Sequence, residues 1–159
     1  MQRPPESAAP AQAEGGCMCG AVRYRTEGPP LSTLYCHCLS CRRHTGAPVV
    51  TLAGYRRDQV RYTKGQPKIF HSSPGVGRAF CGDCGTPLTW EGDGGEEGPL
   101  VEIHINTFDT PEAFAPACHI HHGERLGWFE TTDRLPRYKV WHDDGEAPYL
   151  DGPAALKAS

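Results

Sequence analysis

The chain has 159 residues, of which 38% are hydrophobic, and it contains 19 glycines and 15 prolines. A chain of this length fits one domain, and this composition is typical of a loop-rich β fold that needs stabilisation beyond apolar burial. The formal net charge is −3, and the sequence has no long basic run. These features argue against nucleic acid and anionic membranes as partners.

The composition changes near residue 15. Residues 1–14 are rich in Pro, Ala, Gln and Glu, so we expect a disordered tail there. This stretch lacks the apolar segment of a secretory signal, and no segment is long enough to span a membrane, so a cytoplasmic location is expected. The ordered domain is expected over residues 15–142, and residues 143–159 are expected to form a weakly ordered tail.

From residue 15 onward, the sequence predicts many short strands separated by Gly and Pro. The expected strands cover residues 21–26, 31–36, 48–55, 60–63, 68–71, 77–81, 87–91, 100–108 and 137–142. Only residues 40–45 and 110–114 favour a helix, each of one or two turns. Residues 92–98 (GDGGEEG) are expected to form a flexible surface loop. The predicted fold class is therefore mainly β.

Two pairs of cysteines have the spacing of a closed zinc site. Cys81 and Cys84 are separated by two residues and are followed by Gly85, so both sulfurs can reach one metal while backbone amides turn toward the thiolates. Cys17 and Cys19 supply the second pair. We predict a structural zinc on these four residues. Spacing does not fix the pairing, so the first pair could instead share a metal with the central cysteines.

A third cluster consists of Cys36, Cys38 and Cys41. Closely spaced cysteines in a reducing compartment bind metals more often than they form disulfides, which are the alternative here. Three thiolates leave one position of a tetrahedral zinc open for water or substrate, which is the mark of a catalytic site. The residue count therefore favours a second, catalytic zinc. A histidine would close the site instead, and the candidates are His44, His104, His119, His121 and His122.

An open zinc on three thiolates suits thiol chemistry. Such an ion accepts a fourth sulfur, deprotonates a substrate thiol and polarises an aldehyde oxygen. These properties serve the addition of a thiol to a carbonyl carbon.

The cysteine motifs occur in a specific order along the chain. They read Gly-Gly-Cys17-x-Cys19-Gly, then Cys36-His-Cys38-x-x-Cys41-Arg-Arg-x-Thr-Gly-Ala, then Phe-Cys81-x-x-Cys84-Gly. Later stretches agree, namely Asn106-Thr-Phe-Asp-x-Pro, Trp128 and Asp133-x-Leu-Pro. The chain from Gly15 to Trp141 thereby resembles the glutathione-dependent formaldehyde-activating enzyme family, which includes S-(hydroxymethyl)glutathione synthase.

This resemblance implies a β-tent zinc fold of short antiparallel sheets with a structural zinc site of four cysteines and a second, catalytic zinc on the central cysteines. It also implies a carbon–sulfur lyase whose substrates are glutathione and formaldehyde, or an adduct of the two. Arg42 and Arg43 follow the last central cysteine and could bind a carboxylate of glutathione, or they could form a solvated, ion-paired turn.

Two other functions stay open on the sequence. A non-catalytic zinc module for protein partners would be favoured by a fourth protein ligand on the central zinc. A hydrolase of a small imine or thioester, using zinc-bound hydroxide, would be favoured by turnover without a thiol. Phe108 stands where the family usually has Leu, and it could line a pocket, like Trp128, or belong to the core. Cys118 is expected to be a small buried residue. The histidines at 119, 121 and 122 are denser than the family pattern.

Overall fold

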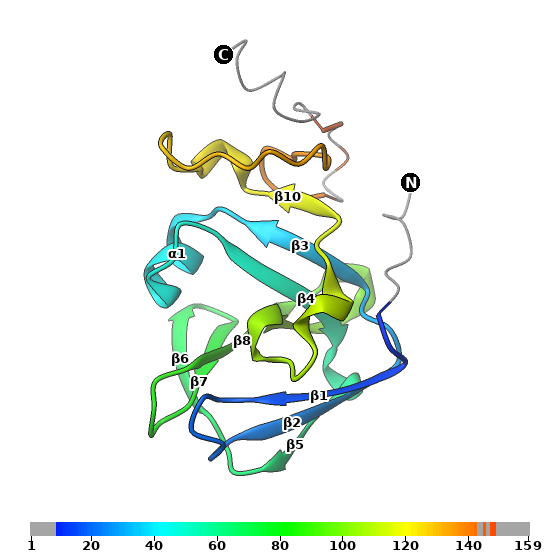
Figure 1. The fold of residues 1–159 in the computed structure, drawn as a ribbon, viewed down its shortest axis with the longest axis vertical. Coiled ribbons are helices and arrows are strands. Elements are labelled where there is room, and N and C mark those ends of the chain that lie inside the picture. Colours follow the sequence, from blue (N-terminus) through cyan, green and yellow to red (C-terminus); the bar gives the residue numbers. More distant parts are fainter. Residues whose placement is uncertain (1–8, 143–144, 146, 149–159) are drawn as a thin grey trace. The chain divides into compact units, whose positions relative to one another are not determined.

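The computed structural model describes residues 9–142, 145 and 147–148 (Figure 1). Residues 1–8 of the predicted amino-terminal tail and most of the predicted carboxy-terminal tail lie outside the described residues. The chain divides into two compact units. Within the described residues, the four-cysteine unit is built from residues 9–32 and 52–115, and the three-cysteine unit from residues 33–51 and the described residues after Ala115. The described helices include none long and apolar enough to cross a membrane.

The first sheet of the four-cysteine unit has three antiparallel strands in the order β1-β2-β5. They are β1 (Gln12–Gly16), β2 (Arg23–Glu27) and β5 (Val60–Lys64), which lie side by side in Figure 1. The strand expected over residues 21–26 is present as β2, in which Tyr24 and Thr26 are buried. The strand β1 was not expected, and it begins at Gln12. The domain boundary at residue 15 stays a prediction.

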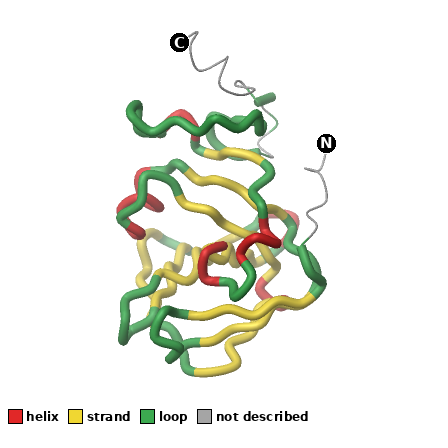
Figure 2. Tube along the Cα trace, viewed as in Figure 1, coloured by secondary structure: helices red, strands yellow, loops and turns green. Residues whose placement is uncertain are grey.

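Five further strands of this unit pair antiparallel in the order β4-β9-β8-β7-β6. Their bounds are β4 (Val50–Arg56), β9 (Pro99–His104), β8 (Pro87–Asp93), β7 (Val76–Phe80) and β6 (Lys68–Ser73). Figure 2 shows strands as the main regular structure and only short helical turns, which agrees with the predicted mainly β class.

The hydrophobic core lies in this unit and gathers side chains from both sets of strands. Phe108 belongs to it, stacking on Phe114 with ring centroids 4.0 Å apart and meeting Tyr24 edge-on at 5.5 Å. Of the two interpretations of Phe108, the structure therefore supports the core residue. The expected strand over 100–108 stops at His104, because the chain turns into a short helix, η3 (Ile105–Thr107).

The other short helices of this unit are η1 (Arg57–Gln59), η2 (Gly95–Glu97) and η4 (Pro111–Phe114). The last agrees with the helical turn expected over residues 110–114. The expected flexible loop over residues 92–98 contains the end of β8 and all of η2.

The three-cysteine unit contains β3 (Ser32–Cys36), α1 (Leu39–Thr45), β10 (Cys118–Ile120) and η5 (His122–Glu124). The strands β3 and β10 pair in parallel, so this pair departs from the expected antiparallel sheets. The predicted strand over residues 137–142 is reduced to one isolated bridge between Arg137 and His119. The expected helix over 40–45 is α1, and it ends at Gly46 in the left-handed conformation (φ 68°) that glycine adopts without strain.

Candidate metal centres

The four-cysteine cluster brings together two segments far apart in the sequence. Cys17 and Cys19 follow β1, whereas Cys81 and Cys84 lie in the turn between β7 and β8. All four sulfurs lie within 4.8 Å of one another, with Cys17–Cys19 at 3.5 Å and Cys19–Cys81 at 3.8 Å. A tetrahedral zinc with bonds of ~2.3 Å holds its sulfurs roughly 3.8 Å apart. The donor set and its spacing therefore fit a closed zinc site.

Neighbouring groups stabilise the charged form of two of these thiols, Cys17 and Cys84. The backbone amide of Val22 donates to the sulfur of Cys17 at 3.2 Å. The hydroxyl of Thr86 lies 3.1 Å from the sulfur of Cys84 and accepts a hydrogen bond from the amide of Met18. Its own proton can therefore point at that sulfur, and this contact lowers the pKa of Cys84 to about 6. Thr86 has no signal in the sequence beyond its place two residues after the second cysteine of the pair.

The three-cysteine cluster is built on the junction between β3 and α1. Cys36 ends β3, Cys38 is the N-cap of α1, and Cys41 lies in its first turn. Their sulfurs lie within 4.8 Å of one another, and the amide of Cys41 donates to the sulfur of Cys38 at 3.3 Å. A capping position is normally filled by an oxygen acceptor. Here the acceptor is a sulfur, so the helix start itself orients one ligand.

The pKa values of two of these thiols shift in opposite directions. Hydrogen bonds from Cys36 and Cys41 lower the pKa of Cys38, and the hydrogen bond to Cys38 raises the pKa of Cys36. Three soft sulfur donors around one point are the ligand set that zinc favours. The described residues add no histidine or carboxylate to this group. The cluster as described is therefore one donor short of a closed tetrahedral site.

Arg42 and Arg43, which could bind a carboxylate of glutathione or form a solvated, ion-paired turn, differ in their surroundings. Arg42 donates from Nε to the carbonyl oxygen of His37 and from Nη2 to that of Glu124, each at 3.0 Å. Arg43 is exposed, and its side chain forms no hydrogen bond or ion pair within the described part of the chain. Glu124 also accepts from the amide of Leu39 at 3.0 Å, at the start of α1. Arg42 thus ties the cysteine loop to η5.

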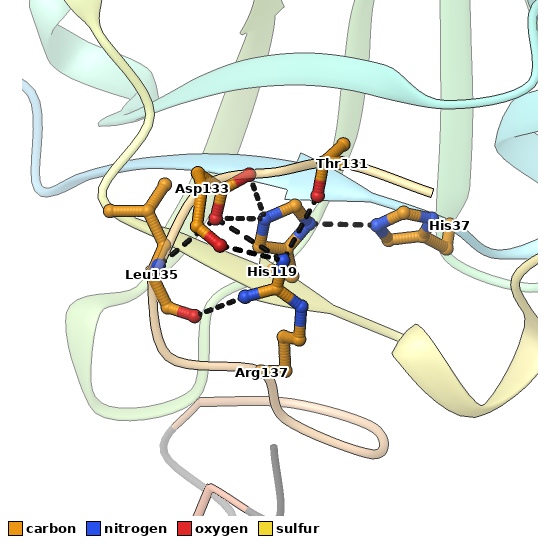
Figure 3. A network of polar contacts seen from close by, with 6 residues as sticks. All are labelled: His37, His119, Thr131, Asp133, Leu135 and Arg137. Carbon is orange, nitrogen blue, oxygen red and sulfur yellow. Dashed lines mark hydrogen bonds and ion pairs between the residues drawn. The ribbon is translucent and has the colours of Figure 1, made fainter. Parts of the chain in front are cut away.

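A buried polar network lies beside the cysteine loop. His37 Nε2 is 2.9 Å from His119 Nδ1, and His119 Nε2 is 3.1 Å from both carboxylate oxygens of Asp133 (Figure 3). Burial lowers the pKa of His37 and of His122 to about 3, and it lowers the pKa of His119 despite the opposing effect of Asp133. These imidazoles are therefore neutral near pH 7.

Two further residues proposed from the sequence are placed clearly by the structure. Trp128 has 75% of its surface exposed, so it is not a core residue. Cys118 is buried in β10, as expected of a small apolar residue.

Comparison with known proteins decides the family. Residues 12–124 match the profile of the glutathione-dependent formaldehyde-activating enzymes. The chain belongs to this family. A search of curated proteins finds no match. Among solved structures, a Rhodobacter sphaeroides protein from a structural-genomics programme is 22% identical over 60% of this chain and 87% of its own, with a TM-score of 0.49. The segment matched to the family contains all seven clustered cysteines.

The two cysteine clusters are visible in the sequence as motifs that the family match covers. The polar network of His37, His119 and Asp133 has little signal in the sequence. The position of His37 between two ligands argues against it as a ligand, and its contact with His119 depends on the pairing of β3 with β10. The sequence indicates Asp133 only as the first residue of the Asp-x-Leu-Pro motif, yet its carboxylate meets a buried histidine. Pairing between distant strands cannot be read from local periodicity.

Proposed function

We propose that this protein is a zinc-dependent carbon–sulfur lyase that forms or cleaves the adduct of glutathione with a small aldehyde such as formaldehyde. The observation that carries the proposal is the group of three sulfurs from Cys36, Cys38 and Cys41, to which the described residues add no fourth ligand. Membership of the glutathione-dependent formaldehyde-activating family supports the substrate class.

A zinc ion held by these three cysteines would bind a substrate thiol as thiolate and polarise a carbonyl oxygen. The chain's own residues set up the site. The amide of Cys41 orients the sulfur of Cys38, and Arg42 fixes the carbonyl between the first two ligands. Arg43, exposed on α1, would bind a carboxylate of glutathione. Arg42 would contribute to the same anion site through Nη1, because its Nε and Nη2 donate to backbone carbonyls.

The second cluster would have a different role. Cys17, Cys19, Cys81 and Cys84 supply a complete tetrahedral shell, which leaves no position for substrate. We assign to it a structural zinc, so that a chain carries two ions. The proposed substrates are small molecules, and neither nucleic acid nor membrane is a proposed partner. The proposed location is the cytoplasm.

Glutathione titration of the cobalt-substituted protein tests this function. We expect sulfur-to-cobalt absorption to increase as the thiol adds to the three-cysteine centre, and the zinc form to catalyse exchange between glutathione, formaldehyde and their adduct. The matched control is Cys36→Ser, which removes one ligand of that centre and leaves the other cluster intact. An unchanged spectrum at millimolar glutathione with both sites loaded would contradict the proposal and favour a non-catalytic zinc module. Turnover of an imine or thioester without thiol would favour a hydrolase.

A further inference from the structure

His37 is held at every polar group but one. Its amide donates to the carbonyl of Ile120 at 3.1 Å, and its carbonyl accepts from Arg42 at 3.0 Å. Its ring Nε2 meets His119 at 2.9 Å. Because His37 lies between Cys36 and Cys38, these contacts fix the peptide that joins the first two sulfur ligands of the three-cysteine centre.

The direction of each hydrogen bond follows from the far end of the network. Asp133 is ionised and only accepts, so His119 donates to it from Nε2. His119 is buried and neutral, so its Nδ1 carries a lone pair and accepts from Nε2–H of His37. The hydrogen bonds therefore all point the same way: His37 donates to His119, and His119 donates to Asp133 (Figure 3).

Asp133 is itself fixed. The amide of Leu135 donates to its Oδ1 at 2.9 Å, and Nη2 of Arg137 lies 3.3 Å from the same oxygen. Arg137 is fully buried and donates from Nη1 to the carbonyl of Leu135 at 2.6 Å. An ionised carboxylate held at a turn by a buried guanidinium gives His119 a rigid partner.

We propose that His119, whose tautomer is fixed by Asp133, is a positioning residue for the three-cysteine metal centre, acting through the His37 side chain on the segment that carries Cys36 and Cys38. The inference rests on the metal-binding part of the proposed function and does not depend on the substrate. Hydrogen bonds that orient a metal ligand from outside the coordination shell typically change metal affinity by about 10–100-fold. A comparable loss is expected when the contact between the two histidines is broken.

The simplest competing explanation is packing. The ring of His119 stacks on Tyr35 with centroids 4.6 Å apart, so any smaller side chain disturbs the interior. Variants that keep or remove one hydrogen bond at similar size separate the two explanations. In His119→Asn, the side-chain oxygen replaces Nδ1 and still accepts from His37, whereas His119→Gln keeps only the group near Asp133.

The same contact can be tested from its other side. In His37→Gln, the amide nitrogen replaces Nε2 and still donates to His119, whereas His37→Asn is too short to do so. These two variants form a second matched pair. They keep the test decisive if a variant at position 119 fails to fold.

The measurement is cobalt and zinc affinity at each cluster by chelator competition, with the four-cysteine cluster as internal control. We expect His119→Gln and His37→Asn to weaken binding at the three-cysteine centre by about 10–100-fold and to change its cobalt absorption bands. We expect His119→Asn and His37→Gln to stay within about threefold of wild type, and the four-cysteine affinity to stay constant.

Equal losses in both members of each pair, or no loss in any variant, would overturn the inference. A wild type that binds no metal at the three cysteines would overturn the inference and the proposed function together. A wild type that binds metal but has no lyase activity would remove the proposed function alone, because the affinity differences can still be measured.

Discussion

Arg42 donates from Nε to the carbonyl oxygen of His37 at 3.0 Å, in the middle of the sequence that carries the first two central cysteines. Its Nη2 holds the carbonyl of Glu124 at the same distance. Arg42 is therefore committed to the architecture of the cysteine loop, whereas its neighbour Arg43 is exposed. Replacing Arg42 and replacing Arg43 should therefore have different effects on the protein.

Replacement of each arginine by alanine tests this separation. We expect Arg42→Ala to lower the free energy of unfolding by about 1–3 kcal/mol, because two backbone carbonyls lose a charged donor. We expect Arg43→Ala to change stability by less than about 0.5 kcal/mol, as for most exposed sites, and to raise KM for the glutathione adduct. Urea denaturation and steady-state kinetics measure the two effects. An unchanged KM in Arg43→Ala would remove that residue from the substrate site.

Gly15→Ala is expected to be strongly destabilising. A Cβ on Gly15 would lie 2.3 Å from the hydroxyl of Tyr24 and 2.4 Å from the carbonyl oxygen of Thr107. Overpacking of this kind typically costs about 1–3 kcal/mol. Gly127→Ala is the matched control, because a Cβ there meets no atom within 4 Å. Thermal unfolding should show a lower Tm for the first variant alone, and equal Tm values would show that β1 does not pack as described.

Phe108→Leu tests the role of this side chain in the hydrophobic core. The aromatic ring stacks on Phe114 and meets Tyr24 edge-on, so we expect a loss of about 1–2 kcal/mol in the free energy of unfolding. Because Phe108 belongs to the core of the four-cysteine unit, the affinity of the three-cysteine centre for metal should stay unchanged. Chemical denaturation and metal competition on the same sample give both values. A change in metal affinity without a change in stability would argue against the core role.

Much of this fold was predictable because the signals were local. The strands expected over residues 21–26, 60–63 and 100–108 correspond to β2, β5 and β9, and cysteine spacing identified both clusters of sulfurs. The strand β1 was missed because QAEGG contains two glycines and little apolar surface. The strand β10 is three residues long, which is too short to show a period. The predicted strand over residues 137–142 has apolar residues but forms only one bridge.

The polar network around His119 could not be read from the sequence for a different reason. Its histidines were visible as a dense group, but their partners depend on register. The parallel pairing of β10 with β3 sets His119 opposite Tyr35, two residues before His37. Asp133 then reaches His119 from a segment without regular secondary structure. These contacts are non-local, and none has a periodic signature.

Cysteine replacement separates the contributions of the two clusters. We expect Cys84→Ser to lose the zinc of the four-cysteine site and much of the stability of the fold, since structural zinc sites supply on the order of 10 kcal/mol of binding free energy. Cys118→Ala is the matched control, because Cys118 belongs to neither cluster. Metal content per chain and chelator-induced unfolding are the measurements. If Cys84→Ser kept wild-type metal content and stability, the structural assignment would be wrong.

Acidification should destabilise the three-cysteine unit through His122. Burial lowers the pKa of His122 to about 3, with smaller effects from His37 and Arg125, whereas an unfolded histidine titrates near ~6.5. Between these values the unfolded chain binds the proton and the folded chain does not. The free energy of unfolding therefore falls as pH falls below roughly 6.5, by on the order of 1 kcal/mol per pH unit for this residue.

The variant His122→Phe removes the titrating group, so on the order of one proton less is taken up on unfolding. The free energy of unfolding of the variant should therefore fall less steeply than that of the wild type between pH 7 and pH 5. Urea denaturation at fixed zinc concentration measures both slopes, and their difference cancels the shared effect of cysteine protonation. His71→Phe serves as control, since His71 is exposed on β6. Equal slopes in the wild type and His122→Phe would mean that His122 is protonated inside the fold, and the neutral histidine cluster would then have to be abandoned.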